Sequence, residues 1–185
     1  MTASPLLRRA ARLLRRGGVV AYPTEAVFGL GCDPGDEAAL RRILAIKGRP
    51  GRAGFILIAA NRGQLQGWIA PTAAEQRRLA APTRSPVTWV VRAGPRAPRL
   101  LTGGRPTVAV RITTHPIAAA LCRAAGMPLI STSANVHGRA PARSALAVRR
   151  RLGRRLDVVV PGATSGQPRP TEIRLAATGA VLRRG

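Results

Sequence analysis

The residues with the clearest chemical potential lie near the start of the chain, in the stretch Val19–Asp33 (VVAYPTEAVFGLGCD). Its β-branched residues predict a short strand, and Pro23 and two later glycines then let the backbone bend or approach another group. Thr24 and Glu25 lie between these features. The whole chain has only seven acidic residues, so a carboxylate after a buried strand favours a functional role. The alternative is a polar turn that carries a surface glutamate.

A second candidate site follows the helix predicted from Asp36 to Lys47. Lys47 and Arg49 are separated by one glycine and followed by Pro50, and cations held on such a preset backbone suit a phosphate. Lys47 is the only lysine in the chain. Either a compact ammonium is required there or the lysine stands there by chance. The G-K-[ST] phosphate loop is absent, which excludes a P-loop enzyme.

A third group of polar residues, Ser131-Thr132-Ser133-Ala134-Asn135, follows a brief strand predicted over 128–130. Open α/β sheets bind ligands at strand ends, so these hydroxyls and the amide predict a hydrogen-bonding platform. The alternative is a turn in which the hydroxyls cap the next element.

Arg111 lies near the end of the strand predicted over 107–112. An arginine in such a place points at an anion or at a partner carboxylate. The preceding segment, 94–106, is rich in Pro, Gly and Arg and shows no periodicity. It is predicted to be a surface loop of the kind that often carries function.

The remaining elements alternate between helices and strands, which predicts a single α/β domain over residues 1–185 with a largely open sheet. The first helix is amphipathic and basic; we expect it to cover one face of the sheet, with a membrane surface or RNA as the alternatives. Further helices are predicted over 62–69, 72–81, 116–125 and 143–152, and further strands over 55–60, 87–92, 157–160 and 180–183.

The charge balance is strongly basic, with 31 basic and 7 acidic residues and a net charge of +24. This charge balance favours polyanions as partners, either nucleic acid or nucleotide phosphates. The alternative is a GC-rich genome that places arginine on a solvated surface.

Cys32 and Cys122 are isolated, which predicts buried thiols in a reducing cytoplasm and no metal site. No apolar run reaches membrane-spanning length, so no membrane association is expected.

Together these stretches resemble the YrdC family of threonylcarbamoyl-AMP synthases, and the short, bacterial TsaC-type form is the closer fit. The likeness covers almost the whole chain in matching order and spacing. It is carried by AYPTEAVFGLGCDP, LAIKGRP, FILIAAN, SPVTWV, VAVRITTHP, PLISTSANVHG and TEIR with GAVLRRG. The resemblance implies a YrdC-like twisted, mixed sheet flanked by helices, with a concave basic face.

The resemblance also implies an activity: L-threonine, bicarbonate and ATP would be joined into threonylcarbamoyl-AMP with release of pyrophosphate. Mg²⁺ would come with the triphosphate rather than occupy a protein cage. Downstream transfer proteins would pass the threonylcarbamoyl group to tRNA, and contact with tRNA or double-stranded RNA is expected. Catalysis would consist of positioning and charge neutralisation, without a protein nucleophile.

The family pattern assigns roles to individual residues of this chain. Lys47 and Arg49 would act as catalytic residues against the ATP phosphates. The residues expected to complete ATP binding are Ser133, Asn135 and Arg183. Arg111 would take the threonine carboxylate in a bidentate pair. The residues expected to finish the threonine pocket are Thr24, Ser131 and Thr171.

This chain departs from the family pattern at four positions near these motifs. Ala53 stands where Asn or Lys is frequent, and Ile58 where longer members carry His. His137 and Pro141 each replace a Ser. None of these positions is one of the site residues named above, but the change at Ala53 removes one expected nucleotide contact.

Two other functions compete with the synthase. One is an RNA-binding protein whose basic face grips structured tRNA or rRNA without chemistry. The other is a carbamoyl-adenylate-forming relative of the hydrogenase-maturation type, for which extra domains and zinc-finger cysteines would be expected.

Overall fold

The computed structural model describes residues 4–83 and 85–185; residues 1–3 of the predicted domain and Arg84 lie outside them. The helices are α1 Pro5–Leu14, α2 Glu37–Lys47, α3 Ala73–Ala80, α4 Arg99–Thr102, α5 Pro116–Ala125 and α6 Ala145–Leu152, with 3₁₀ helices η1 Gly51–Ala53, η2 Arg62–Leu65 and η3 Gly153–Arg155. The strands are β1 Val20–Pro23, β2 Phe28–Gly31, β3 Ile56–Ala59, β4 Val87–Arg92, β5 Thr107–Ile112, β6 Leu129–Ser133, β7 Val158–Val159, β8 Glu172–Leu175 and β9 Val181–Arg183.

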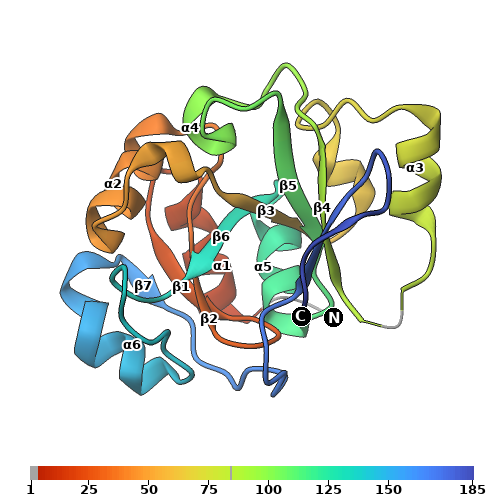
Figure 1. The fold of residues 1–185 in the computed structure, drawn as a ribbon. Coiled ribbons are helices and arrows are strands. Elements are labelled where there is room, and N and C mark those ends of the chain that lie inside the picture. Colours follow the sequence, from red (N-terminus) through yellow and green to blue (C-terminus); the bar gives the residue numbers. More distant parts are fainter. Residues whose placement is uncertain (1–3, 84) are drawn as a thin grey trace.

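Within the described residues the strands form one mixed sheet in the order β7-β1-β2-β6-β3-β5-β4-β8-β9 (Figure 1). The pairs β1–β7, β3–β5 and β4–β8 are parallel, and the other neighbours are antiparallel. The predicted single α/β domain with an open sheet flanked by helices is therefore confirmed. The order also brings β6 between β2 and β3, so segments distant in sequence meet at the centre of the sheet.

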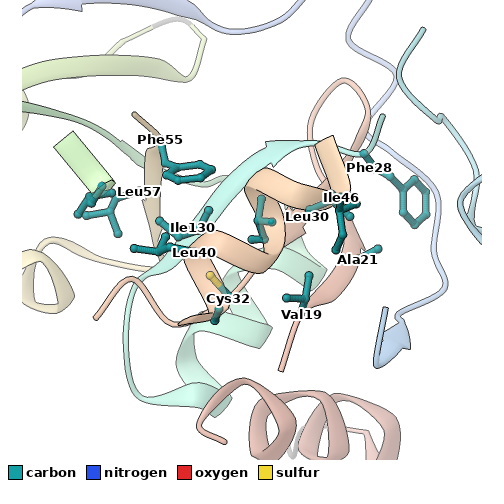
Figure 2. Close-up of a cluster of buried hydrophobic side chains, with 14 of the residues drawn as sticks. Val19, Ala21, Phe28, Leu30, Cys32, Leu40, Ile46, Phe55, Leu57 and Ile130 are labelled. Atoms are coloured by element: carbon teal, nitrogen blue, oxygen red, sulfur yellow. The ribbon is translucent and has the colours of Figure 1, made fainter. Parts of the chain in front are cut away.

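The sheet has a hydrophobic core on each face, because successive side chains of a strand point to opposite sides. Val20 and Tyr22 pack with buried residues of α1 and α5, which lie together on one face. Ala21 packs on the other face with residues of α2 and α6. Figure 2 shows this second cluster, where Leu40 and Ile46 of α2 lie over the strands. The first helix covers the sheet as expected.

The helix starts follow from local sequence. The Ser4 hydroxyl accepts a hydrogen bond from the Leu7 N–H at 3.3 Å, and Asp36 accepts one from the Ala39 N–H at 3.0 Å. Both side chains satisfy donors that have no partner within the helix. No helix in the described part of the chain is long and apolar enough to span a bilayer.

Strand β2 was not predicted. The segment with Gly29 and Gly31 was expected to be a turn, but it forms β2, which pairs with both β1 and β6. A Cβ on Gly31 would lie 2.6 Å from Cε1 of Tyr22 and 2.7 Å from the Ile130 carbonyl oxygen. Close packing with the Tyr22 ring, whose hydroxyl donates to the same carbonyl, therefore accounts for a poor strand former in a central strand.

Three smaller expectations also need correction. The helix predicted over 62–69 is only the 3₁₀ turn η2, and the loop predicted over 94–106 contains the short helix α4. The strand predicted to end at Ile130 continues to Ser133, because β6 pairs through these hydroxyl residues with β2 on one side and β3 on the other.

A substitution at Gly31 tests this packing. We expect Gly31→Ala to lower the free energy of unfolding by about 2 kcal/mol, because the added methyl group has no room between the Tyr22 ring and β6. Gly153→Ala is the matched control: its Cβ would meet no atom closer than 3.8 Å, and a change within about 0.5 kcal/mol is expected. Urea denaturation measures both, and equal midpoints would contradict the packing argument.

Candidate active site

A cavity of about 740 Å³ opens between the β1–β2 turn, the end of β6, the turn after α2, and strands β3, β5, β8 and β9. Most of the predicted site residues line it. They are Thr24, Arg49, Arg111, Ser131, Ser133, Thr171 and Arg183. Lys47 and Asn135 do not line it and lie directly behind Ser133, as the hydrogen bonds below show. The sheet topology thus gathers residues from six separate segments around one space.

Glu25 is buried, with 1% of its surface exposed, so the alternative of a surface glutamate is wrong. Its Oε2 lies 3.3 Å from Nη2 of Arg111. Its Oε1 accepts hydrogen bonds from the Thr113 hydroxyl at 2.7 Å and from the Thr114 N–H at 3.1 Å. Burial raises the pKa of Glu25, but the Arg111 charge and the Thr113 hydrogen bond outweigh it and hold this pKa below its ordinary value.

Arg111 is also held from its other side. Its Nη1 donates to the Thr171 hydroxyl at 2.7 Å and to the Thr88 hydroxyl at 3.4 Å. The guanidinium is buried and lines the cavity, and its Nε has no hydrogen-bond partner among the described residues. The fork is therefore preset at one end of the cavity, a geometry that suits bidentate binding of a carboxylate.

The segment 161–170 runs along this end of the cavity. The N–H of Ser165 donates to the Thr24 carbonyl at 3.3 Å, and the N–H of Gln167 donates to the Glu25 carbonyl at 3.1 Å. Arg183 Nη2 donates to the Thr171 carbonyl at 2.9 Å. The first two bonds attach the Gly/Pro segment to the β1–β2 turn. The third holds the backbone of Thr171, whose hydroxyl accepts from Arg111.

Lys47 is buried with 3% of its surface exposed. Its Nζ donates to the carbonyls of Ser133 at 2.6 Å and Asn135 at 3.0 Å, and to Asn135 Oδ1 at 3.2 Å. Burial, and then the charge of Arg49, lower the pKa of Lys47 to about 8. This ammonium therefore fixes the end of β6, and its role against phosphates stays a prediction.

The predicted platform is part strand and part turn. Ser131 and Ser133 belong to β6 and line the cavity. The Ser133 hydroxyl donates to Asn135 Oδ1 at 2.6 Å, and the Asn135 amide donates to the carbonyls of Val136 and Arg139. The Asn135 side chain thus stabilises the turn after β6, which is the structural role that the alternative prediction gave to this group of residues. Ser131 and Ser133 line the cavity.

The cavity wall is strongly basic. Among the described lining residues Glu25 is the single acid, against Arg49, Arg105, Arg111 and Arg183. Burial and the neighbouring charge of Arg105 lower the pKa of Arg49, and burial and the charge of Arg111 lower that of Arg183. Like charges are thus held close together at the wall, which favours an anionic ligand.

The departures from the family pattern fall in different places. Ala53 and Pro141 line the cavity. Ile58 is fully buried in the core beside α1 and α5. His137 contributes its backbone N–H to the Lys47 carbonyl at 2.7 Å, a bond that does not depend on the side chain.

Three lining or supporting residues were not predicted: Thr88, Thr113 and Arg105. Thr88 and Thr113 hold Arg111 and Glu25. The adjacent threonines after Arg111 in the sequence were a signal, because polar residues directly after a buried strand need partners. Arg105 lies in the segment 94–106, and the composition of that segment predicts a loop without indicating where its side chains lie. No group of three His, Cys, Asp or Glu side chains suited to a metal occurs in residues 4–83 and 85–185.

Comparison with known proteins connects this architecture to a family. The Sua5/YciO/YrdC family model, described as "Telomere recombination", matches residues 12–185. A relative from Halorhodospira halophila, named threonylcarbamoyl-AMP synthase, is 56% identical over 179 residues, covering 96% of this chain and 94% of the relative. A relative of the same name from Nitrosococcus oceani is 53% identical and covers 96% of each chain.

Solved structures give the same result. Sua5 from P. abyssi in complex with L-threonine superposes with a TM-score of 0.87 at 32% identity, over 96% of this chain and 53% of that protein; this chain thus spans about half of it. E. coli YciO superposes with a TM-score of 0.80 at 29% identity, over 97% of this chain and 89% of that one. The fold and cavity define a YrdC-like α/β protein. The chain belongs to the Sua5/YciO/YrdC family.

The Glu25–Arg111 pair makes stability depend on pH. Because the pKa of Glu25 is lowered in the folded protein, its contribution is present above the ordinary value of 4.5 and is lost as pH falls through the lowered pKa. We expect Glu25→Gln to cost about 3 kcal/mol of unfolding free energy at neutral pH. The variant should also lose less stability than the wild type when pH is lowered from about 5 to about 3.

Glu37→Gln is the control for this prediction. Glu37 pairs with Arg41 at 3.1 Å on the surface, and such exposed pairs contribute less than about 1 kcal/mol. Chemical denaturation at a series of pH values compares the two variants. Equal losses at neutral pH would show that the buried pair does not support the site.

Proposed function

We propose that this protein is an L-threonylcarbamoyladenylate synthase, which makes threonylcarbamoyl-AMP and pyrophosphate from L-threonine, bicarbonate and ATP. The observation that carries this proposal is the preset Arg111 fork, placed among hydroxyls at one end of a cavity whose lining also includes Arg49, Arg105 and Arg183. Such a space suits an amino acid beside a nucleotide. The names of relatives that cover almost the whole chain, and the threonine complex of P. abyssi Sua5, support the same function.

The amino-acid end needs a carboxylate partner and groups that orient an amine and a hydroxyl. Arg111 is proposed to bind the threonine carboxylate, and its contacts to Glu25 and Thr171 support this by fixing the direction of the fork. Thr24, Ser131 and Thr171 supply hydroxyl groups in the same part of the cavity wall. Fixed donors and acceptors lower the entropy cost of placing the substrate.

The nucleotide end needs positive charge and oxygen or amide groups. Arg49 and Arg183 are proposed to contact the triphosphate, and Ser133 and Asn135 to hold the nucleotide or its Mg²⁺. Lys47 fixes the end of β6 on which Ser133 lies, so it supports that site directly and could reach phosphates only by releasing one of its bonds. Mg²⁺ enters with ATP as part of the substrate and prefers oxygen ligands, which the hydroxyls provide.

The reaction requires no protein nucleophile. The neutral threonine amine adds to bicarbonate with loss of one water molecule, which gives a carbamate anion. A carbamate oxygen then attacks the α-phosphorus, and the bond from that phosphorus to the bridging oxygen breaks to release pyrophosphate. The cations neutralise charge on the phosphates as this bond breaks, while the cavity aligns the two reactants.

The alternative of an RNA-binding protein without chemistry leaves the buried Arg111 end of the cavity without a purpose. RNA contact is compatible with the enzyme as a further property, and tRNA and downstream transfer proteins are the partners proposed for the product. The two buried free thiols fit the reducing cytoplasm, which we propose as the location.

The activity is tested by pyrophosphate release. We expect release from MgATP and bicarbonate to require L-threonine. Arg111→Lys should raise the threonine KM by about tenfold and leave the ATP KM within about twofold, because lysine keeps a charge near Glu25 but lacks the bidentate fork. Arg92→Ala, on the exposed end of β4, is the control for loss of a distant charge. Release that is independent of threonine would refute the proposal.

RNA contact has a candidate surface. Five arginines at positions 149, 150, 151, 154 and 155 are exposed along α6 and η3, and residues 145–155 include no acid. Surfaces of this kind bind phosphate backbones through counterion release. We expect the triple variant Arg149→Gln, Arg150→Gln, Arg154→Gln to weaken binding of a tRNA and to reduce the slope of log affinity against log salt by about 2 to 3.

The same triple substitution of Arg9 and Arg12 on α1 and of Arg16 just after it is the matched control, because it removes an equal charge from another exposed surface. Filter binding at several salt concentrations measures both slopes. If both triple variants reduced the salt slope equally, RNA binding would depend on overall charge and not on α6 and η3, which would contradict the prediction.

A further inference from the structure

Arg105 lines the cavity from the segment between α4 and β5. Its Nη1 donates to the Arg52 carbonyl at 3.1 Å, and its Nη2 donates to the Ala53 carbonyl at 3.0 Å. Both acceptors belong to η1, the turn that follows Arg49 in the sequence. The guanidinium therefore joins two segments that are about 50 residues apart, and it is oriented before any ligand binds.

The backbone that carries Arg105 is itself fixed against the same turn. The Phe55 N–H donates to the Leu101 carbonyl at 2.9 Å. A Cβ on Gly103 would lie 2.5 Å from the Arg52 carbonyl oxygen and 2.8 Å from the Gly54 nitrogen. The two chain segments thus touch backbone to backbone, which only glycine allows at position 103, where φ is +66°.

Arg105 lies close to a second cation. Nη2 of Arg49 donates to the Gly54 carbonyl, and Nη2 of Arg105 donates to the carbonyl of the preceding residue, Ala53. Burial and then the charge of Arg105 lower the pKa of Arg49, and none of the ion pairs in the described part of the chain includes either residue. Two guanidinium groups are therefore held near each other at the cavity wall without a carboxylate between them. Their repulsion opposes folding of the free protein, and a bound anion would relieve it.

The hydrogen-bonding capacity of Arg105 points the same way. A guanidinium has five N–H donors, and the bonds to Arg52 and Ala53 use two of them. The remaining donors belong to an exposed side chain that lines the cavity.

We propose that Arg105 is a further phosphate-binding residue, which grips the triphosphate of ATP together with Arg49. This inference rests on the proposed synthase function and adds a residue that the motifs do not include. It assigns to Arg105 two roles that use different N–H groups: one pair holds the turn, and the others bind phosphate.

The variant Arg105→Ala tests the proposal. We expect its KM for MgATP to rise by about tenfold, with the threonine KM within about twofold of wild type, because a charged hydrogen bond to one substrate is lost. Binding of inorganic tripolyphosphate, measured by calorimetry without threonine, should weaken by a similar factor. Arg99→Ala is the matched control, since it removes the same charge from α4 at an exposed residue outside the cavity.

A second variant separates phosphate binding from a structural role. Arg105→Lys keeps the charge but cannot bridge both carbonyls, so tripolyphosphate affinity should stay within about threefold of wild type. If Arg105 only braced the turn, Lys and Ala would weaken binding equally and both would lower the melting temperature. That result would overturn the proposal, as would equal tripolyphosphate affinity of Arg105→Ala and Arg99→Ala.

The outcomes also separate this proposal from the function on which it rests. A wild-type protein that binds tripolyphosphate through Arg105 but releases no pyrophosphate with threonine would refute the synthase and support the Arg105 site. A wild-type protein that shows threonine-dependent release, with an unchanged ATP KM in Arg105→Ala, would refute the Arg105 site alone.

Discussion

The structure of the site depends on the buried ion pair between Glu25 and Arg111. Two charges in a protein interior are tolerated when they are paired and hydrogen-bonded. Here Glu25 Oε1 accepts from Thr113 and the Thr114 N–H, while Arg111 Nη1 donates to Thr171. These partners come from the β1–β2 turn, the segment after β5 and the segment before β8. One electrostatic requirement therefore fixes three distant parts of the chain around the amino-acid end of the cavity.

At the other end of the cavity, the arginines have no acidic partner among the described residues. Arg49 and Arg105 hydrogen-bond adjacent carbonyls without an acid between them, and burial together with the charge of Arg105 lowers the pKa of Arg49. The two arginines stay close despite their repulsion because backbone contacts hold the turn after α2 against the segment after α4. A cation paired with an acid and cations without one thus share one space, an arrangement that suits the proposed reaction between an amino-acid carbamate and a nucleotide.

Much of this arrangement could be predicted from the sequence. Helical periodicity and capping residues located α1 and α2, and the strand-end positions of Arg111 and Ser131 pointed to a common site. Two kinds of feature could not be predicted from the sequence. The strand β2 was missed because its glycines serve contacts with Tyr22 and Ser131 that exist only in the folded protein. Arg105 was missed because its role depends on the distant η1 turn, and local composition describes only a loop.

The most direct test of the account is a crystal structure with L-threonine and a non-hydrolysable ATP analogue bound together. We expect the threonine carboxylate within hydrogen-bond distance of both Nη atoms of Arg111, with the triphosphate against Arg49 and Arg105 in the same cavity. Threonine bound away from Arg111, or a nucleotide bound outside this cavity, would contradict it.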